Sequence, residues 1–533
     1  MIEKVRLRGY RKYRDMVFKP TPSMNILVGD NEAGKSTIIE AINLAMAGRI
    51  NGRAAQEELN PYWFNQDVVR EFFAARSRGE KVALPTISIE VFFHDDDKLQ
   101  NLVGAHNSDL PVRACPGVEL FIEPNVDYAD EIETYLGSDT SILPVEFYSV
   151  EWRTFGDRKL TAKPRELATA LIDSRTIRST SGIDFHLRQM LSDHLDPKEK
   201  AAISIAYRSV KEKMTTDHLA DVNEKMSLLE GALDDKPISL AMDQSSRTSW
   251  DASVSPYVAD LPFAMAGLGQ QAAVKIALAM SRSATVARVV MIEEPENHLS
   301  YTSLNKLVSR IDSLRSEGQQ IFVATHSSFV LNRLGLDSLA LVSGDKVARF
   351  DEISADTVNY FRKLPGYDTL RLVLSERSAL VEGPSDEILF ERFYFDKFGK
   401  RPIEDGIDVI SMRGLSLKRC LELAKLLDKR CVAMRDNDGT DPSSLVADLG
   451  ELISDRRQAY IGNVAAGLTL EPQVINANSD ANLRTALKIA PQASVLTWMT
   501  NNKTEAAIRI ADSSTTLAPP QYMADAIESI NAG

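Results

Sequence analysis

The sequence has few cysteines and no long apolar run. Its 533 residues include three cysteines, Cys115, Cys420 and Cys431, and no C-x-x-C pair. This excludes a disulfide framework and a paired-cysteine zinc site, so we expect reduced core thiols and a cytosolic location. No stretch of about 18 apolar residues occurs, and the N-terminal MIEKVRLRGYRKY alternates and is basic. Membrane insertion and secretion are therefore not expected.

The chain also lacks an excess of positive charge. Its net charge of −13 at pH 7 argues against a protein that coats nucleic acid by bulk electrostatics. Bound metal ions and clustered arginines can still reverse the sign of one cleft, so local contact is not excluded. The hydrophobic fraction of 44% and charged fraction of 26% are ordinary for a well-packed protein. A chain of 533 residues is too long for one core, and we expect two or three domains.

The first motif lies between a predicted strand and a predicted helix. The apolar run NILVG leads into GDNEAGKST, in which four residues separate Gly29 from Gly34. This is the P-loop pattern, whose glycines let the backbone wrap phosphates while the lysine and the following hydroxyl serve phosphate and Mg²⁺. Apolar residues follow at helical spacing, so the loop opens a helix whose N-terminal amides hold phosphate. We expect this loop to bind ATP and one magnesium ion through Asn31, Gly34, Lys35, Ser36 and Thr37, with Ser36 on the metal.

Two different kinds of segment follow the P-loop. TISIEVFF and VELFIEP are strand-like, and we expect an antiparallel sheet extension that completes the first part of the nucleotide domain, residues 1–165. Residues 166–240 are helical in period and rich in charge, from PRELATALIDSRTI onward. This pattern suits an inserted helical arm used for dimerisation and suits a solvated helical hairpin equally well.

Nucleotide chemistry returns after the predicted arm. In AGLGQQAAVKIALAM a glycine-containing turn opens a helix, which would present its amides to a nucleotide held by a second subunit. VVMIEEPENHLS is a buried strand that ends in two glutamates, one to hold magnesium and one to orient or deprotonate the attacking water. QIFVATHSS is another strand, and its histidine would touch the terminal phosphate. The residues concerned are Gly269 and Gln270 on the helix, Glu293 as the metal-side acid, and Glu294 and His326 as catalytic groups.

In this order the motifs resemble the ATPase heads of the ABC and SMC-like class. More narrowly, IEEPENHLS followed by ATHSSFVLN looks like the head of the OLD (overcoming lysogenisation defect) family, whose ATPases are fused to a C-terminal nuclease domain. The second part of the head would be residues 241–369. Two positions depart from the ABC pattern: Gly267 and Leu268 stand where Ser and Gly are usual, and Glu293 replaces Asp. ATP binding is therefore a firmer expectation than rapid ATP turnover.

Alternation of strands and helices restarts near the end of the predicted head. ALVEG, DVISMRG and RCVAMRDND are predicted strands, separated by helices at 385–399 and 416–428. This βαβαβ order predicts a small parallel sheet within a second domain, residues 370–533. Ligands bind at the carboxyl edge of such sheets. The expected fold class is α/β: an ABC-type P-loop ATPase domain with an inserted helical dimerisation arm, followed by this C-terminal domain.

Carboxylates follow two of these predicted strands. Glu382 ends the first strand, and Asp386 lies in the opening turn of the next helix. Asp436 and Asp438 are two residues apart, so they project from one face if the backbone is extended. Four oxygen-bearing groups at one sheet edge suit hard divalent cations such as magnesium.

These residues match the Toprim domain, a metal-binding fold that resembles those of topoisomerases, primases and OLD nucleases. Glu382 corresponds to its first glutamate and Asp436 with Asp438 to its D-x-D pair. Glu471 in GLTLEPQV and Lys503 in NNKTEAAIRI are similar to the acidic strand and terminal lysine of OLD nucleases. The resemblance implies two Mg²⁺ or Mn²⁺ ions, which activate water and stabilise the leaving oxygen. Metal ligands would be Glu382, Asp386, Asp436, Asp438 and Glu471, and Lys503 would neutralise charge on the phosphate.

Plainer interpretations exist for the same residues. DNDGTDP also suits a polar turn, and Asp386 suits a helix N-terminal acid favoured by the dipole. Glu471 and Lys503, taken alone, suit ordinary surface charges. An EF-hand is excluded, because Gly439 comes fourth rather than sixth and Ala447 occupies the position of the bidentate glutamate.

The resemblance implies a nucleotide-regulated, metal-dependent DNA endonuclease that acts as a homodimer or higher homo-oligomer in prokaryotic defence against phage. OLD nucleases of Gabija- or retron-type systems often work beside a helicase-like or reverse-transcriptase component. The alternative is a non-nucleolytic ATPase that clamps or tethers DNA, like repair proteins with related heads. Basic groups for phosphate contact occur in RLRGYRKYR and in the predicted helix at 416–430, although a solvated charged face is the commoner explanation for such segments.

Overall fold

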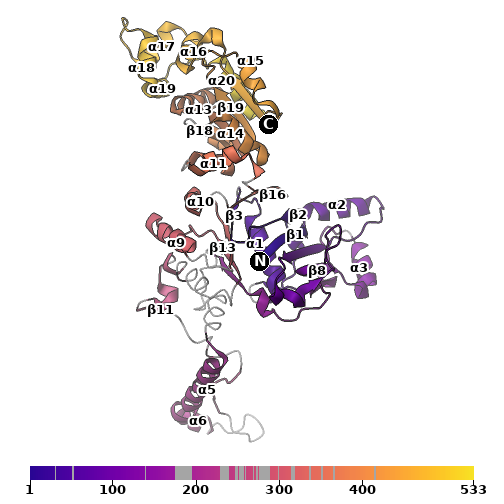
Figure 1. The fold of residues 1–533 in the computed structure, drawn as a ribbon. Helices are drawn as coiled ribbons and strands as arrows, with labels where there is room; N and C mark the ends of the chain where they lie inside the picture. The colour runs from indigo at the N-terminus through magenta and orange to yellow at the C-terminus, as the bar shows by residue number, and fades with distance from the viewer. Residues whose placement is uncertain are drawn as a thin grey trace. The chain divides into compact units, whose positions relative to one another are not determined.

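The computed structural model divides into two compact units, and each is described by itself (Figure 1). The first comprises residues 1–5, 21–24 and 39–323, and the second comprises residues 6–20, 25–38 and 324–533. The structure describes residues 1–29, 32–50, 53–138, 140–173, 195–227, 239–245, 250, 257–258, 260–267, 269–271, 274, 288–297, 299–313, 319–334, 338–349, 352–363, 367–412 and 416–532. Within these ranges no helix has both the length and the apolar character of a membrane span.

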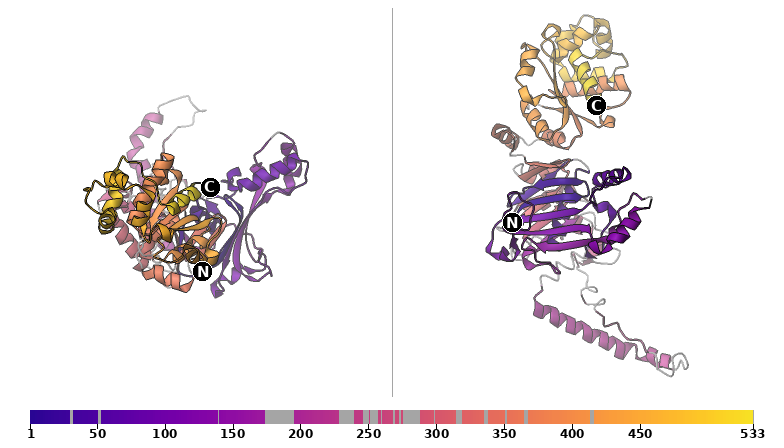
Figure 2. Two further views of the ribbon diagram at one scale, coloured as in Figure 1. Left: turned by 90° about the horizontal axis from the view of Figure 1, so that it is seen from above. Right: turned by 90° about the vertical axis from the view of Figure 1, so that its right-hand side faces the viewer.

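An antiparallel sheet forms the first unit's main layer. β6 (Ile87–Phe93) pairs with β8 (Cys115–Pro124), and β8 also pairs with β9 (Tyr148–Thr154). These strands lie side by side in the right-hand view of Figure 2. Every residue of β6 and the first six of β8 are buried, so both faces of these strands are covered. The two-residue period of a strand places the alternating apolar side chains on one face and Glu90 and Glu119 on the other. The predicted antiparallel extension is thus confirmed; its flanking helices are α2 (Gln66–Ser77) and α3 (Ala129–Leu136).

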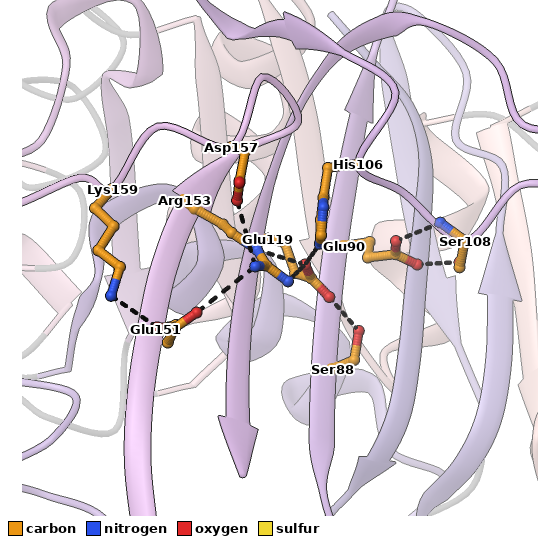
Figure 3. A network of polar contacts seen from close by, with 9 residues as sticks. All are labelled: Ser88, Glu90, His106, Ser108, Glu119, Glu151, Arg153, Asp157 and Lys159. Atoms are coloured by element: carbon orange, nitrogen blue, oxygen red, sulfur yellow. Dashed lines mark hydrogen bonds and ion pairs between the residues drawn. The ribbon is translucent and has the colours of Figure 1, made fainter. Parts of the chain in front are cut away.

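Polar side chains cover part of this sheet (Figure 3). Glu119 on β8 accepts hydrogen bonds from Ser88 Oγ at 3.0 Å and from the Arg153 guanidinium at 3.0 and 3.1 Å. On β6, Glu90 accepts from the backbone amide of Ser108 at 2.7 Å and from its hydroxyl. Both glutamates are buried. Because a buried carboxylate is costly unless it is hydrogen-bonded or paired, this network is what allows acids on a covered sheet face.

The predicted helical arm begins later than expected. Residues Thr169–Asp173 form strand β10, which pairs in parallel with β13 (Val289–Glu293), so a helix over this stretch is wrong. Its sequence TALID suits a buried parallel strand as well as a helix. A run of three apolar residues is too short for the periods of a strand and a helix to be distinguished. Helices follow at α5 (Pro197–Lys213), which begins with a capping box from Asp196, and α6 (Ala220–Ser227). Dimerisation through this segment stays a prediction.

Parallel strands continue the nucleotide-binding part of the chain. β14 (Gln320–Ala324) neighbours β13 in the first unit. In the second unit β15 (Leu339–Ser343) pairs in parallel with β3 (Met24–Val28) and antiparallel with β16 (Lys346–Arg349). All five residues of β3, β13 and β14 are buried, as expected for strands covered on both faces. The helices of this part of the chain are α1 (Lys35–Ala47), α9 (Tyr301–Ser313), α10 (Ser328–Leu334), α11 (Ala355–Lys363) and α12 (Tyr367–Leu374). The strands β1 (Ile2–Tyr10) and β2 (Tyr13–Phe18) belong to the sheet that contains β6 and β8.

A second parallel sheet organises the C-terminal part of the second unit. Its strand order is β18-β17-β19-β20, and all neighbouring pairs are parallel. Three strands were predicted, whereas β20, within RQAYI, was not, because this stretch carries little apolar pattern. The bounds are β17 (Arg377–Val381), β18 (Ile407–Ser411), β19 (Arg430–Arg435) and β20 (Arg457–Ile461). Helices of the sheet are α13 (Pro384–Phe398), α14 (Leu417–Leu426) and α15 (Pro442–Ala447), and C-terminal helices are α16 (Leu470–Ala477), α17 (Asp480–Leu487), α18 (Val495–Asn501), α19 (Lys503–Asp512) and α20 (Gln521–Asn531).

Candidate nucleotide and metal sites

The P-loop joins β3 to α1 in the manner that its motif requires. Gly34 has φ +99°, and a Cβ there would overlap the hydroxyl of Tyr13. That tyrosine donates a hydrogen bond to the carbonyl of Ala33 at 3.3 Å, and Lys12 Nζ donates to the carbonyl of Glu32 at 2.7 Å. Glycine is therefore needed both for the backbone angle and for the close approach of the β1–β2 turn. Asn31 lies outside the described residues.

The predicted phosphate-binding groups meet where α1 begins. Lys35 is the first residue of α1, and its buried ammonium donates to the carbonyl of Gly29 at 2.8 Å. Ser36 and Thr37 follow in the same turn, which contains no acidic residue. A helix N-terminus with a lysine and no acid in its first turn favours an anion, so these residues fit the phosphates of ATP.

Two carboxylates stand at the end of β13, as predicted. Glu293 is the last residue of the strand and is buried. Glu294 follows with φ +47° and accepts a hydrogen bond from Asn297 Nδ2 at 2.6 Å. The register of the parallel pair sets Asp173 of β10 opposite Glu293. It is a third acidic residue at this sheet edge, and its segment was predicted to be helical.

The remaining residues predicted to contact nucleotide lie after β14 and at the start of a helix. His326 follows β14 and its side chain is exposed. Gly269 and Gln270 are helical, and the adjacent backbone amide of Gln271 donates to the carbonyl of Gly267 at 3.0 Å. The glycine-containing turn thus opens a helix as expected. Leu268 lies outside the described residues.

Four of the predicted nuclease acids lie together at the carboxyl edge of the second sheet. Glu382 follows β17, and its Oε2 accepts a hydrogen bond from the backbone amide of Asp436 at 3.0 Å. Asp386 lies in the first turn of α13 and accepts from the amide of Gly383 at 3.2 Å. Glu471 lies in the first turn of α16. Each strand end or helix start therefore delivers one carboxylate to the same place.

These acids perturb one another strongly. The pKa of Asp386 is raised to about 7, first by burial and next by the charge of Glu382, with a smaller contribution from Glu471, against two backbone hydrogen bonds. Burial likewise raises the pKa of Asp436 to about 7, with Glu382 and Asp386 as the next causes. Acids that share a site without matching positive charge favour protonation, and a divalent cation would reverse this preference.

Glu471 has a cationic partner. Its Oε1 lies 3.5 Å from Lys503 Nζ, and its Oε2 accepts from Thr469 Oγ1 at 3.0 Å. The lysine is the first residue of α19 and is half-exposed. The expected acidic strand around Glu471 is wrong, because this residue lies in the first turn of a helix. Its role and that of Lys503 in catalysis stay predictions.

Asp438 does not join the other acids. Its side chain is 56% exposed and lies 3.6 Å from Arg435 Nη2. The backbone is not extended here, since Asp438 has φ +48° and the buried Asn437 anchors the turn by donating to the carbonyls of Gly462 and Gly467 at 3.0 and 2.7 Å. The expectation that Asp436 and Asp438 share one face is therefore wrong.

Tyr522 is a neighbour of the acids that sequence reading missed. It lies on α20, 6% exposed, and its hydroxyl has no hydrogen-bond partner among the described residues. Burial raises the pKa of this phenol well above 10, and the charge with the largest effect on it is that of Asp386, followed by that of Asp436. A tyrosine on an amphipathic C-terminal helix carries no sequence signal beyond that of a core residue.

The donor set fits a hard divalent cation in its chemistry. Carboxylate oxygens are the preferred ligands of Mg²⁺ and Mn²⁺, and Asp386 and Asp436 are destabilised by their shared negative field. Across the described ranges, no three His, Cys, Asp and Glu side chains are placed to hold a metal ion as they stand. Ion binding would therefore require side-chain rotation. The residues that would hold an ion are Glu382, Asp386, Asp436 and Glu471.

Family models match most of the chain. A model described as "AAA domain" matches residues 4–236, and a second AAA-domain model matches residues 242–332. A model described as "Overcoming lysogenization defect protein-like, TOPRIM domain" matches residues 373–438.

Curated relatives match shorter stretches. The arabinose import ATP-binding protein AraG of Mannheimia succiniciproducens is 31% identical over 107 residues, 20% of this chain and 20% of that protein. The DNA replication and repair protein RecF of Alkaliphilus oremlandii is 41% identical over 49 residues, 9% of this chain and 13% of that protein. The matched region spans a fifth or less of the length of either relative.

Solved structures resemble each part weakly. The SMC head domain from Thermotoga maritima has a TM-score of 0.28 at 12% identity, covering 64% of this chain and 93% of that one. The C-terminal region of the Burkholderia pseudomallei OLD protein has a TM-score of 0.26 at 18% identity, covering 30% of this chain and 98% of that one. From its family matches, the chain carries an AAA-type ATPase domain followed by an OLD-like Toprim domain, the combination that its motifs predict.

Proposed function

We propose that the protein is a nucleotide-regulated DNA endonuclease that needs Mg²⁺ or Mn²⁺. The observation that carries this proposal is the group of four acids at the carboxyl edge of the Toprim sheet, with Lys503 beside Glu471. A structural Toprim domain has no need to gather acids whose pKa values rise to about 7. Sites of this kind are candidates for catalysis because the perturbation costs stability unless function requires it.

Each residue has a defined role in this proposal. Glu382, Asp386, Asp436 and Glu471 hold the metal pair, which, when bound, activates water and stabilises the leaving oxygen. Lys503 lies close enough to Glu471 to orient it and exposed enough to meet a phosphate oxygen. Asp438 would act outside the metal shell, through Arg435.

Nucleotide would act as a regulator through the head. Lys35, Ser36 and Glu293 would hold ATP with one magnesium ion, and Glu294 and His326 would serve hydrolysis. Gly269 and Gln270 would face a nucleotide of a second copy, which makes the active form a homodimer or higher homo-oligomer. By analogy with OLD nucleases, we propose a cytoplasmic role in antiviral defence, with a helicase-like or reverse-transcriptase component as a further partner.

The test combines metal, nucleotide and two variants. Supercoiled and linear DNA are incubated with the full-length protein and Mg²⁺ or Mn²⁺, with and without ATP, beside Asp436→Ala, Lys35→Ala and the control Asp480→Ala. Asp480 is an exposed first-turn acid of α17 that pairs with Arg484 and is not one of the four acids. We expect cleavage by the parent and the control, none by Asp436→Ala, and loss of the ATP effect in Lys35→Ala. Intact DNA under every metal condition would refute the nuclease proposal.

The second candidate is an ATPase that clamps DNA without cutting it. It is favoured by the similarity of part of the chain to RecF and by the absence, in the described ranges, of three side chains ready to hold an ion. ATP-dependent retention on closed circular DNA without nicking, unchanged in Asp436→Ala, would select this candidate.

A further inference from the structure

A cavity of about 660 Å³ opens at the carboxyl edge of the Toprim sheet, with Glu382 in its wall. All four parallel strands end at it. Met412 follows β18, whereas Arg435 and Ile461 are the last residues of β19 and β20. Ligands of open parallel sheets bind at this edge, and clefts for small molecules are typically ~300–1,000 Å³.

One part of the cavity wall is aliphatic. Met412 and Leu449 are buried, and Leu445 and Ile461 are half-buried, so each presents part of its side chain to the cavity. Such a surface suits a flat apolar group such as a nucleobase. Asp448 lines the same cavity and offers an acceptor for amino groups on a base edge.

Another part of the wall is cationic. Lys418 lies in the first turn of α14 and is exposed, and Arg435 is 40% exposed. The ion pair of Arg435 with Asp438 is a surface pair, which is readily exchanged for another anion. α14 has no acid in its first turn, and Ser416 makes no side-chain cap there. The charge of this wall is complementary to a phosphate group.

We infer that this cavity receives one unpaired nucleotide, with its base against the aliphatic wall and its phosphate on Lys418 and Arg435. The inference rests on the proposed nuclease function, because Glu382 is shared between the cavity and the acids. A base that is stacked and paired in a duplex cannot enter a cavity, so its occupant must be extruded or already single-stranded. Extrusion is easiest where pairing is absent. The substrate is therefore DNA with an unpaired nucleotide beside the cut: an overhang, a bulge or a frayed end.

A free nucleotide has the same chemistry as a nucleotide within a strand. The two sources are distinguished by binding in EDTA, which removes any need for cleavage. Oligonucleotides with one 2-aminopurine, either bulged or paired, are titrated with Lys35→Ala protein, in which the head does not compete. Thymidine 5′-monophosphate is titrated in parallel, with hydrogen exchange of α15 as the readout.

Two variants with matched controls make the binding test specific. Leu445→Glu places an acid in the aliphatic wall, and Leu496→Glu makes the same change on the exposed surface of α18. Lys418→Ala removes one cation, and Lys425→Ala does so two turns further along α14. We expect a rise in 2-aminopurine fluorescence with the bulged base only, and at least tenfold weaker binding in Leu445→Glu and Lys418→Ala but not in the controls.

The outcomes separate this inference from the nuclease proposal. Unstacking of the bulged base without any cleavage in Mg²⁺ supports the cavity and refutes the nuclease. A second outcome is cleavage that does not depend on a bulge, an overhang or an abasic residue beside the cut, without a change in fluorescence. It refutes nucleotide binding in the cavity and is consistent with the nuclease proposal. Protection of α15 by the mononucleotide alone identifies free nucleotide as the occupant, and the absence of both signals overturns the inference.

Discussion

Replacing Asp386 by asparagine should stabilise the metal-free Toprim domain at neutral and alkaline pH. The folded carboxyl has a pKa of about 7, raised first by burial, whereas an unfolded aspartate titrates near 3.8. A group with a raised folded pKa contributes its full stability below the unfolded pKa and loses it as pH rises through the folded value. The parent should therefore lose stability between about pH 4 and pH 7, and Asp386→Asn should lose less.

The magnitude follows from the same two pKa values. Their separation corresponds to at most about 4 kcal/mol, because one pKa unit is ~1.4 kcal/mol. The Asp386 charge also raises the pKa of Asp436, so its removal relieves Asp436 and acts in the same direction. We expect the variant to be more stable by about 2–4 kcal/mol at pH 8 in EDTA and by less than about 1 kcal/mol at pH 4. Asparagine keeps an oxygen that can accept from the amide of Gly383.

Hydrogen exchange by mass spectrometry measures the stability of the Toprim domain itself. Thermal melting of the whole chain would report both compact units together. Protection of β17 and β19 amides at pH 8 should rise by roughly 30- to 1,000-fold in Asp386→Asn. Asp480→Asn is the control. Asp480 lies in the first turn of α17, its side chain is 68% exposed, and it forms a salt bridge with Arg484. Its replacement should therefore change stability by no more than the small contribution of a surface ion pair.

The addition of Mg²⁺ should invert the comparison. A ligand that binds only the folded state at a hundred times its Kd stabilises by about 2.7 kcal/mol, and Asp386→Asn removes one of its oxygens. Protection should then rise more in the parent than in the variant. A parent that is more stable at pH 8 than at pH 5 in EDTA, or a variant that is less stable throughout, would refute the electrostatic reasoning.

The other predictions concern single side chains. Lys35→Ala should weaken ATP binding at least about tenfold in a fluorescent-nucleotide titration, since it removes the charge at the start of α1. Asp438→Asn should retain far more DNA cleavage than Asp436→Asn in a gel assay, because its side chain lies apart from the other acids; equal losses would contradict this placement. Arg153→Ala should lower the stability of β8 by about 2 kcal/mol in hydrogen exchange, because Glu119 is left buried without its main partner. Tyr522→Phe should not lower stability, since the hydroxyl it removes has no partner among the described residues; a loss above about 1 kcal/mol would contradict this.

Sequence patterns predicted the parts of the fold in which local and long-range signals agree. The P-loop, the two glutamates at the end of β13 and the acids Glu382 and Asp386 come where apolar runs end abruptly, and parallel strands bring such ends to one edge. The failures have physical causes. The geometry of Asp438 depends on Asn437, whose amide is anchored by carbonyls about 25–30 residues further along the chain, and no local pattern reports such a contact.

Other misses arise from ambiguous or absent patterns. TALID in β10 is too short for periodicity to separate strand from helix. Glu471 lies in the first turn of a helix, where Pro472 is well tolerated, whereas the family resemblance suggested an acidic strand. Tyr522 reaches the acids from α20, more than a hundred residues beyond Asp386, and only tertiary packing brings it there.

The hydrogen bond from the Asp436 amide to Glu382 determines which substitution of Glu382 is suitable for an inactive variant. Glu382→Ala would remove a charge and also untie the loop after β19, so its loss of activity would report a displaced backbone as much as a missing ligand. Glu382→Gln keeps an oxygen for the amide while it discards the charge. Glutamine is thus the better choice for trapping an intact complex, whereas an alanine variant invites a false reading of what the carboxylate does.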